Sequence, residues 1–112
     1  MDIYKLRANV LKALAHPDRL RIYEYLSAQG ESCVCDMADA LGISQPSTSK
    51  HIALMRDTGL LESRRDGAMV HYSVAAVCLM NIFTCLDRSI GNSLKRQQDA
   101  LSSLGDTAGN TL

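Results

Sequence analysis

The chain has 112 residues, 46% of them hydrophobic and 21% charged, and its twelve Lys and Arg residues balance twelve Asp and Glu residues. Because a domain usually takes about 100–150 residues, we expect one compact domain with short extensions and no separate catalytic domain. The composition excludes a charge-rich disordered segment, while the balanced charge neither favours nor excludes a polyanionic partner.

Two helices are predicted in the first 30 residues. Apolar side chains recur at helical spacing at Ile3, Leu6, Val10, Ala13 and Leu14, and this pattern stops at residues 15–17. Pro17 suits the first turn of a second helix, which Gly30 ends. The apolar stripe of the second helix is expected at Leu20, Tyr23 and Leu26.

Two further helices are predicted on either side of a short turn at residues 42–44. Ser32 is expected to cap the first of them, whose apolar positions are Val34, Met37, Ala38 and Leu41. Ser44 is expected to cap the second, with Pro46 in its first turn and with Ile52 and Met55 facing inward. Two short helices joined in this way form a helix-turn-helix.

A β-hairpin is predicted after Gly59, where the runs 60–65 and 68–74 flank Asp66 and Gly67. A two-residue loop there would pair Arg65 with Ala68. This register puts one set of side chains toward the core, namely Leu61, Val70 and Tyr72. It puts a second set toward solvent, namely Glu62, Arg64, Met69 and His71.

A fifth helix is predicted from residue 75 to about residue 90, with its continuation over residues 94–104 left open, and its first half is apolar nearly all round. One small helix cannot hide such a surface, so we expect it to pack against a second copy of the chain. The core of this twofold interface is predicted at Leu79, Ile82, Phe83 and Leu86. Residues 1–101 would form the folded domain, and residues 102–112 a flexible tail.

No membrane segment and no secretion signal is expected. The longest nearly apolar run, residues 74–86, is too short to cross a bilayer, which needs about 20 apolar residues, and no basic stretch followed by an apolar run begins the chain. The four cysteines, Cys33, Cys35, Cys78 and Cys85, are therefore expected to be thiols of a cytoplasmic protein rather than a disulfide framework.

The polar side of the fourth predicted helix combines short hydroxyls, an amide and cations, which suit phosphates and base edges of DNA. Its members are Ser44, Gln45, Ser47, Thr48, Ser49, Lys50, His51 and Arg56. The hairpin adds Arg64 and Arg65. An ordinary solvated helix face is the alternative, but the basic hairpin beside a helix-turn-helix favours DNA binding.

Four segments in order resemble the signature of the ArsR/SmtB family of bacterial regulators: PDRLRI at 17–22, ESCVCDM at 31–37, SQPSTSKH at 44–51 and GAMVHY at 67–72. The resemblance covers roughly residues 5–90. It implies a mainly α, homodimeric winged helix-turn-helix protein with a β-hairpin wing. It also implies a non-enzymatic repressor that needs no cofactor to occupy a palindromic operator in double-stranded DNA, until an inducer binds.

Cys33 and Cys35 resemble the pair with which arsenical repressors of this family bind As(III) and Sb(III). In an ideal helix, residues two apart lie about 200° apart around the axis, so both sulfurs are expected to reach one ion only if the first turn distorts. Ser32 as cap, together with the helix N-terminus, is expected to favour the thiolate forms.

The third ligand is open. Some family members carry a third cysteine where this chain has Ala38, so either two thiolates suffice or Cys78 or Cys85 contributes. The alternative for these two is that they are small buried apolar residues. A related branch binds zinc through Asp and His on the fifth helix; no histidine occurs there, so that site is expected to be absent. The three histidines, His16, His51 and His71, are expected at a helix boundary and on the surface rather than as ligands.

Two alternatives keep other chemistry open. The same repressor fold could sense Cd(II), Pb(II) or Cu(I), or the oxidation of its thiols to a disulfide or polysulfide. A small thiol oxidoreductase is the remote alternative, because Cys-x-Cys is a poor match to the redox motif Cys-x-x-Cys.

Overall fold

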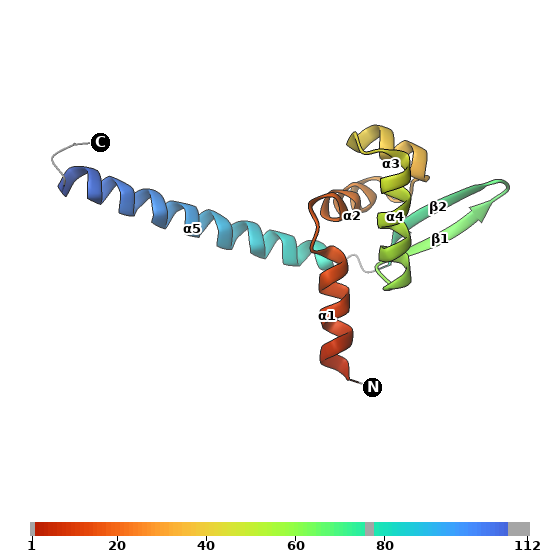
Figure 1. Cartoon of the computed structure of the whole chain (residues 1–112), viewed down its shortest axis with the longest axis horizontal. Helices are drawn as coiled ribbons and strands as arrows, with labels where there is room; N and C mark the ends of the chain where they lie inside the picture. Colours follow the sequence, from red (N-terminus) through yellow and green to blue (C-terminus); the bar gives the residue numbers. More distant parts are fainter. Residues whose placement is uncertain (1, 76–77, 108–112) are drawn as a thin grey trace. The chain divides into compact units, whose positions relative to one another are not determined.

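The computed structural model describes residues 2–75 and 78–107, and the side chains of residues 2–75 and 78–102. The chain divides into two compact units, Met1–Val77 and Cys78–Leu112. Figure 1 shows the order of the helices and strands within them. Among the described helices, none is both long and apolar enough to cross a bilayer.

The first two helices begin at side-chain caps. Asp2 caps α1 (Ile3–Leu14), where its carboxylate accepts the Tyr4 N–H at 2.9 Å. His16 caps α2 (Pro17–Gln29), where its Nδ1 accepts the Asp18 N–H at 3.0 Å. The buried face of α2 consists of Ile22, Tyr23 and Leu26. The prediction of Leu20 in this stripe is wrong: Leu20 is 36% exposed, because it lies about 110° around the helix from the centre of the buried face.

The helix-turn-helix is confirmed, with one change at its start. The first helix, α3 (Val34–Leu41), is preceded by Cys33 and not by Ser32 as N-cap. Ser32 is extended and forms a β-bridge with Tyr72 instead, so the predicted Ser32 cap is wrong. Gly42 ends α3, and the Ser44 hydroxyl caps α4 (Gln45–Asp57) by accepting the Ser47 N–H at 3.2 Å.

The hairpin consists of β1 (Leu61–Asp66) and β2 (Met69–Val74), with Asp66 opposite Met69. The loop is therefore residues 67–68, and the predicted pair of Arg65 with Ala68 is wrong. Gly67 takes the first loop position with φ of +63°, a backbone conformation that glycine adopts without strain.

The faces of the hairpin survive this correction, because each residue's partner moves by two positions and side chains alternate with a period of two. Leu61 is buried, and Val70 and Tyr72 are half-buried on the same face. Glu62, Arg64 and Met69 on the other face are exposed, while His71 is half-buried. The hairpin is thus covered on one face near its base and open at its tip.

The core of the first unit lies between α2, α3, α4 and the base of the hairpin. Its fully buried large side chains are Tyr23, Ile22, Leu26, Met37, Ile52, Met55, Leu60 and Thr48. The first unit is a winged helix-turn-helix, in which the hairpin is the wing.

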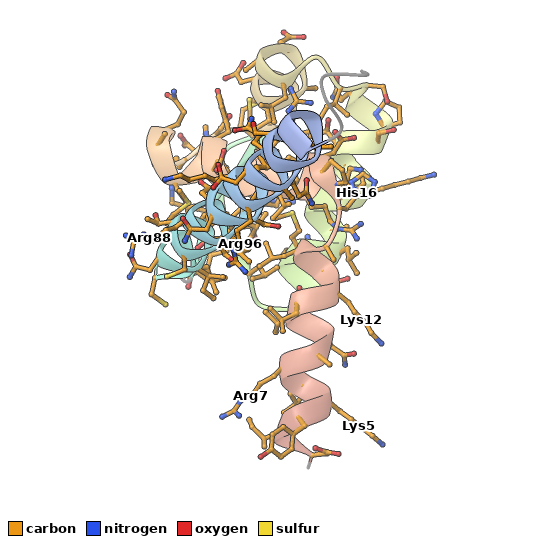
Figure 2. The ribbon with its side chains drawn as sticks, turned by 90° about the vertical axis from the view of Figure 1, so that its left-hand side faces the viewer. Lys5, Arg7, Lys12, His16, Arg88 and Arg96 are labelled. Carbon is orange, nitrogen blue, oxygen red and sulfur yellow. The ribbon has the colours of Figure 1, made fainter. Side chains whose placement is uncertain are left out.

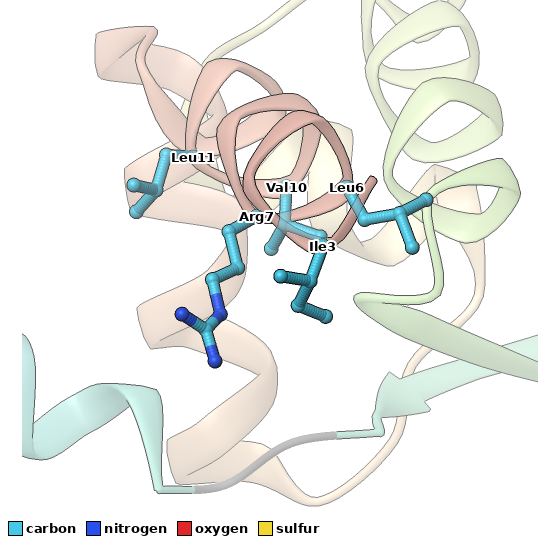
Figure 3. Close-up of a pocket in the computed structure, with 5 residues that line it drawn as sticks. All are labelled: Ile3, Leu6, Arg7, Val10 and Leu11. Carbon is cyan, nitrogen blue, oxygen red and sulfur yellow. The ribbon is translucent and has the colours of Figure 1, made fainter. Parts of the chain in front are cut away.

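Helix α1 is amphipathic and leaves its apolar side exposed. Figure 3 shows this side, where a hollow of about 430 Å³ is lined by Ile3, Leu6, Arg7, Val10 and Leu11. Lys5 and Lys12 extend from another side of the helix (Figure 2). An apolar surface of this kind is typical of a contact with another protein chain.

The second unit contains α5 (Leu79–Thr107), which is longer than predicted. The predicted helix start falls partly on residues 76–77, and the end of the predicted tail on residues 108–112, all of which lie outside the described residues. The helix itself continues past the expected boundary at residue 101. Its exposed apolar side chains follow one side: Ile82, Leu86, Ile90, Leu94 and Leu101. Arg88 and Arg96 lie on another side of the same helix (Figure 2).

Candidate functional site

The polar face of α4 is open to solvent at Gln45, Ser47, Ser49 and Lys50. The prediction that Thr48 belongs to this face is wrong, because Thr48 is fully buried and its hydroxyl donates to the Ser44 carbonyl oxygen at 2.9 Å. A polar residue in the first turn of a helix can satisfy its hydroxyl on the preceding backbone, which periodicity alone does not reveal.

Two other predicted members of this face have partners within the chain. The side chain of His51 is only 16% exposed, and its ring lies 4.5 Å from that of His16, so His51 sits beside α2 rather than on the open face. The guanidinium of Arg56 lies 3.3 Å from the carboxylate of Asp57. The open polar face of α4 is therefore concentrated in its first two turns.

The wing carries two arginines with different surroundings. Arg64 and Arg65 are both exposed, but only Arg64 makes a bidentate pair with Glu31, with contacts of 2.5 and 3.3 Å; Arg65 has no ion pair among the described residues. The hydrogen bond between the partners lowers the pKa of Glu31 and raises that of Arg64. This pair is not predictable from local sequence patterns, because its members are 33 positions apart.

The sulfurs of Cys33 and Cys35 lie 3.2 Å apart. The expectation that only a distorted helix could bring them together is wrong, because α3 begins at Val34 and Cys33 has extended backbone angles, φ −84° and ψ 166°. The ideal angle of about 200° between the two positions applies only inside a helix. Both sulfurs therefore reach one point without any change in α3.

The Cys33 thiol is buried, and its acidity differs from the prediction. The backbone N–H of Asp36 lowers its pKa, but the hydrogen bond with Cys35, burial and the Asp36 carboxylate together hold the pKa above its ordinary value. The expectation that the helix N-terminus favours the thiolate form is wrong for Cys33, since the N-terminal effect on its pKa is outweighed.

The carboxylate of Asp36 lies close to the two sulfurs. One oxygen of Asp36 and the sulfurs of Cys33 and Cys35 all lie within 4.8 Å of one another. Asp36 is not among the ligands predicted from the sequence, although its place directly after Cys35 is a signal for it. Cys78 and Cys85 are both exposed, so the alternative that they are small buried apolar residues is wrong for the single chain.

The cysteine pair opens into a pocket of about 310 Å³ that it shares with the polar face of α4 and with the wing. Its lining includes Cys33, Cys35, Gln45, Ser49, Met69 and Tyr72. Gln45 and Ser49 are predicted DNA contacts, so the two sites that the sequence predicts separately meet in one place.

The backbone joins the cysteine pair to the wing as well. The N–H of Ser32 donates to the Tyr72 carbonyl at 3.0 Å, and the N–H of Tyr72 donates to the Ser32 carbonyl at 2.9 Å. Glu31, one residue earlier, holds Arg64. Residues 31–33 thus continue directly from wing contacts into the cysteine pair.

Comparison with known proteins agrees with this architecture. The family described as bacterial regulatory protein, arsR family, matches residues 16–63. A homodimeric winged helix-turn-helix DNA-binding domain from Mycobacterium bovis superposes with a TM-score of 0.70 at 30% identity, covering 84% of this chain and 86% of that one. The chain belongs to the arsR family.

Two relatives in this family have names that concern toxic elements. The arsenical resistance operon repressor of Escherichia coli (strain K12) is 46% identical over 64% of this chain and 62% of its own length. The cadmium resistance regulatory protein CadC homologue of Staphylococcus aureus is 39% identical over 60% of this chain and 55% of its own length. The chain thus covers less than two thirds of the length of each of these two relatives.

The arsR family consists of transcriptional regulators and not of enzymes. The alternative of a small thiol oxidoreductase is therefore set aside. The two relatives respond, by their names, to different elements, so family membership alone leaves the inducer open.

Proposed function

We propose that this arsR-family protein is a repressor that binds a palindromic operator as a homodimer and leaves it when As(III) or Sb(III) binds Cys33 and Cys35. The observation that carries the proposal is the pair of sulfurs 3.2 Å apart, in a pocket that also contains Gln45 and Ser49. The identity of 46% with an arsenical resistance operon repressor supports the choice of element.

In the DNA complex, α4 enters the major groove with its first two turns. Gln45, Ser47, Ser49 and Lys50 offer the amide, hydroxyls and ammonium that recognise base edges and phosphates. Arg64 and Arg65 of the wing contact the phosphate backbone or the minor groove. Thr48 is buried, holds the first turn of α4 in place and does not touch DNA. Ser44 caps the helix and is exposed, so it stays among the proposed DNA contacts.

The dimer forms through the exposed apolar side chains of α5, with Ile82 and Leu86 at its centre and Leu79 beside them. Phe83, which the sequence also predicts at this interface, is only 8% exposed within the single chain. The exposed apolar side of α1 is a second contact surface. A twofold arrangement then places two α4 helices about one turn of DNA apart, near 34–36 Å, as a palindromic operator requires.

Induction acts through the shared pocket. As(III) held by both sulfurs occupies space beside Gln45, Ser49 and Tyr72, and it moves residues 31–33, which are bonded to the wing. The orientation of α4 and the position of the wing therefore change together. An allosteric coupling of about 1–3 kcal/mol would weaken operator binding about 5–150-fold.

The third position on As(III) is filled from the pocket side by hydroxide or a small external thiol, or by Cys78 or Cys85. A second candidate inducer, Cd(II) or Pb(II), is favoured by Asp36, because two sulfurs with a carboxylate oxygen suit a divalent soft ion. The cadmium-resistance relative supports the same alternative.

Titration of the protein–operator complex, with DNA release followed by fluorescence anisotropy, tests the proposal. As(III), Cd(II) and hydrogen peroxide are added separately to the unmodified chain and to the Cys33→Ser variant. Release by As(III) that the variant lacks is the expected result. Release by Cd(II) alone or by peroxide alone would mean that this agent, and not As(III), is the inducer. A protein that does not bind the operator before any addition would overturn the proposal that it is a repressor.

A further inference from the structure

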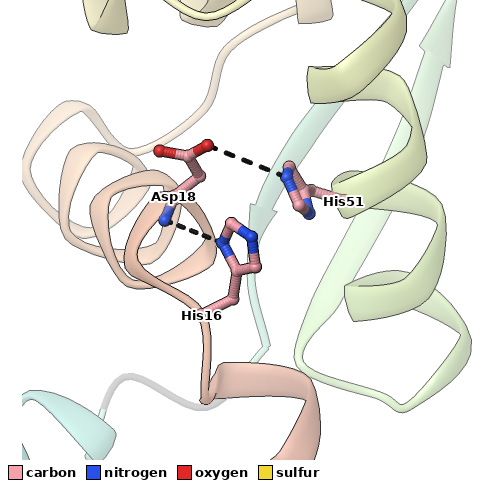
Figure 4. Close-up of side chains that lie close together, drawn as sticks. All are labelled: His16, Asp18 and His51. Atoms are coloured by element: carbon pink, nitrogen blue, oxygen red, sulfur yellow. Dashed lines mark hydrogen bonds and ion pairs between the residues drawn. The ribbon is translucent and has the colours of Figure 1, made fainter.

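Three side chains with metal-binding groups meet where the start of α2 lies beside the middle of α4 (Figure 4). One nitrogen each of His16 and His51 and one carboxylate oxygen of Asp18 all lie within 4.8 Å of one another. Nε2 of His51 is 4.0 Å from Oδ2 of Asp18, and the centroids of the two imidazole rings are 4.5 Å apart. All three residues are half-buried. The sequence predicts these histidines at a helix boundary and on the surface, so their meeting is new information.

We propose that His16, Asp18 and His51 form a second metal site, which binds a divalent transition ion such as Zn²⁺ independently of the cysteine pair. Two imidazoles and a carboxylate are typical ligands for such an ion. Zinc–ligand bonds of about 2.0–2.2 Å put neighbouring ligand atoms about 3.3 Å apart. Closing the 4.0 Å separation between His51 and Asp18 therefore needs side-chain movements below about 1 Å.

The rings are held in position before an ion arrives. His16 is the N-cap of α2, and its Nδ1 accepts the backbone N–H of Asp18. His51 lies on α4, whose neighbouring residue Ile52 is packed in the core. Ligands fixed by capping and packing lose little freedom on binding, which favours a metal site over a chance cluster.

Two arginines oppose a cation here: Arg21, whose guanidinium lies 3.5 Å from the Asp18 carboxylate, and Arg19. The guanidinium NH1 of Arg19 lies 3.4 Å from Nδ1 of His51, and its Nε is buried without a hydrogen-bond partner among the described residues. An ion bound to Nε2 of His51 moves the ring proton to Nδ1 and displaces this guanidinium. Because the contact with His51 is long, and the Arg19 NH2 keeps its hydrogen bond to the Lys12 carbonyl, the exchange costs little.

An ion at this site would tie the start of α2 to the helix that carries Ser49 and Lys50, and would stabilise the helix-turn-helix.

The test uses the full chain with Cys33→Ser and Cys35→Ser, which removes the competing thiols. Co²⁺ is added and its visible absorption is followed, and the melting temperature is measured with and without Zn²⁺. We expect one Co²⁺ per chain and a melting temperature about 10 °C higher at a zinc concentration 100 times the Kd, reversed by a chelator. His16→Gln, Asp18→Asn and His51→Gln should each weaken binding at least about 10-fold.

His71→Gln is the matched control, because this third histidine lies on β2, outside the cluster, and should leave Co²⁺ binding unchanged. The proposal is overturned if the Cys33→Ser/Cys35→Ser protein, with all three histidines present, shows neither the absorption nor the rise in melting temperature. It is also overturned if binding persists in both His16→Gln and His51→Gln. The measurement on the Cys33→Ser/Cys35→Ser protein leaves His16, Asp18 and His51 unchanged. It therefore tests the proposal even if a histidine variant fails to fold.

Discussion

The polar face of α4 and the cysteine pair at the start of α3 are neighbours, but helical spacing determines which side chains lie together only in the first of them. Lys50 and Ser49 lie inside a regular helix, where a spacing of 3.6 residues per turn fixes which side chains share a face. Cys33 and Cys35 lie on either side of a helix start, where that spacing does not apply. The lesson is that periodicity predicts binding faces within helices but misplaces ligands at their ends.

The largest expected effect tests the helix-end site. Replacing Cys33 or Cys35 by Ser should raise the As(III) concentration that releases operator DNA by about 100-fold or more, because one sulfur lacks the gain from holding the ion at two points. Operator affinity without As(III) should stay within about twofold, since neither sulfur is needed for DNA contact. Anisotropy titration of each variant measures both quantities.

Cys85→Ser is the matched control for that comparison, because Cys85 is an exposed thiol on α5. It should leave the response unchanged if two thiolates suffice. If the Cys33→Ser/Cys35→Ser double variant still releases DNA on As(III), the sensing site lies on α5 and the contrast between the two regions is wrong.

The second prediction concerns the assembly on which the α4 face depends. Ile82→Asp or Leu86→Asp should abolish the dimer and weaken operator binding about 100-fold or more, because two α4 helices no longer bind as one unit. Asn81→Asp is the matched control, since it places the same charge on another side of α5. Sedimentation velocity and operator titration are the measurements. A Leu86→Asp protein that remains dimeric would refute the assignment of α5.

The third prediction separates two members of α4 that the sequence places together. Lys50→Ala should weaken operator binding by about 1–3 kcal/mol, which is about 5–150-fold, and leave folding stability nearly unchanged. Thr48→Val should lower the free energy of unfolding by about 1 kcal/mol through loss of the hydrogen bond to Ser44, with no change in base preference. Equal losses of operator affinity in both variants would contradict the buried position of Thr48.

Much of the fold follows from local patterns in the sequence. The spacing of Ile52 and Met55 predicts the buried side of α4, Ser44 predicts its start, and Gly42 predicts the end of α3, as the structure confirms. These features depend on residues within a few positions of one another. Local patterns are therefore sufficient for the helix-turn-helix.

The corrected features depend on contacts between distant residues. Ser32 pairs with Tyr72 instead of capping α3, and this contact places Cys33 outside the helix. Arg64 pairs with Glu31, and His51 contacts His16 and Asp18, although these partners are at least 30 positions apart in the sequence. No local spacing encodes these contacts, so the ligand geometry at Cys33 and Cys35 could not be predicted from the sequence.

The fourth prediction uses pH to distinguish the two inducers at the cysteine pair. The raised pKa keeps the Cys33 thiol protonated at neutral pH. Cd(II) must displace this proton, so its binding should strengthen about tenfold per pH unit between about pH 6 and 8 for the Cys33 proton alone. As(III) enters as its neutral trihydroxide, whose hydroxides leave as water with the thiol protons, so its binding should be nearly independent of pH in this range.

Titrations of DNA release at three pH values check this difference. Cd(II) binding that does not change with pH would mean that Cys33 is already a thiolate at neutral pH. Burial, Cys35 and the Asp36 carboxylate would then not raise the pKa of Cys33. A steep As(III) response would mean that a charged species binds instead.

The smallest expected effect concerns the wing, where Arg64 is paired and Arg65 is exposed. Arg65→Ala should lower the slope of log operator affinity against log salt concentration by about 1, as expected for one lost phosphate contact. Arg64→Ala should lower it by less, because Glu31 already neutralises part of its charge. Glu31→Gln should have the opposite effect, raising affinity a few-fold and steepening the salt dependence, since it frees Arg64 for the phosphates. If Glu31→Gln instead leaves the slope unchanged and weakens binding, the pair with Glu31 serves to position the wing, and Arg64 does not contact DNA.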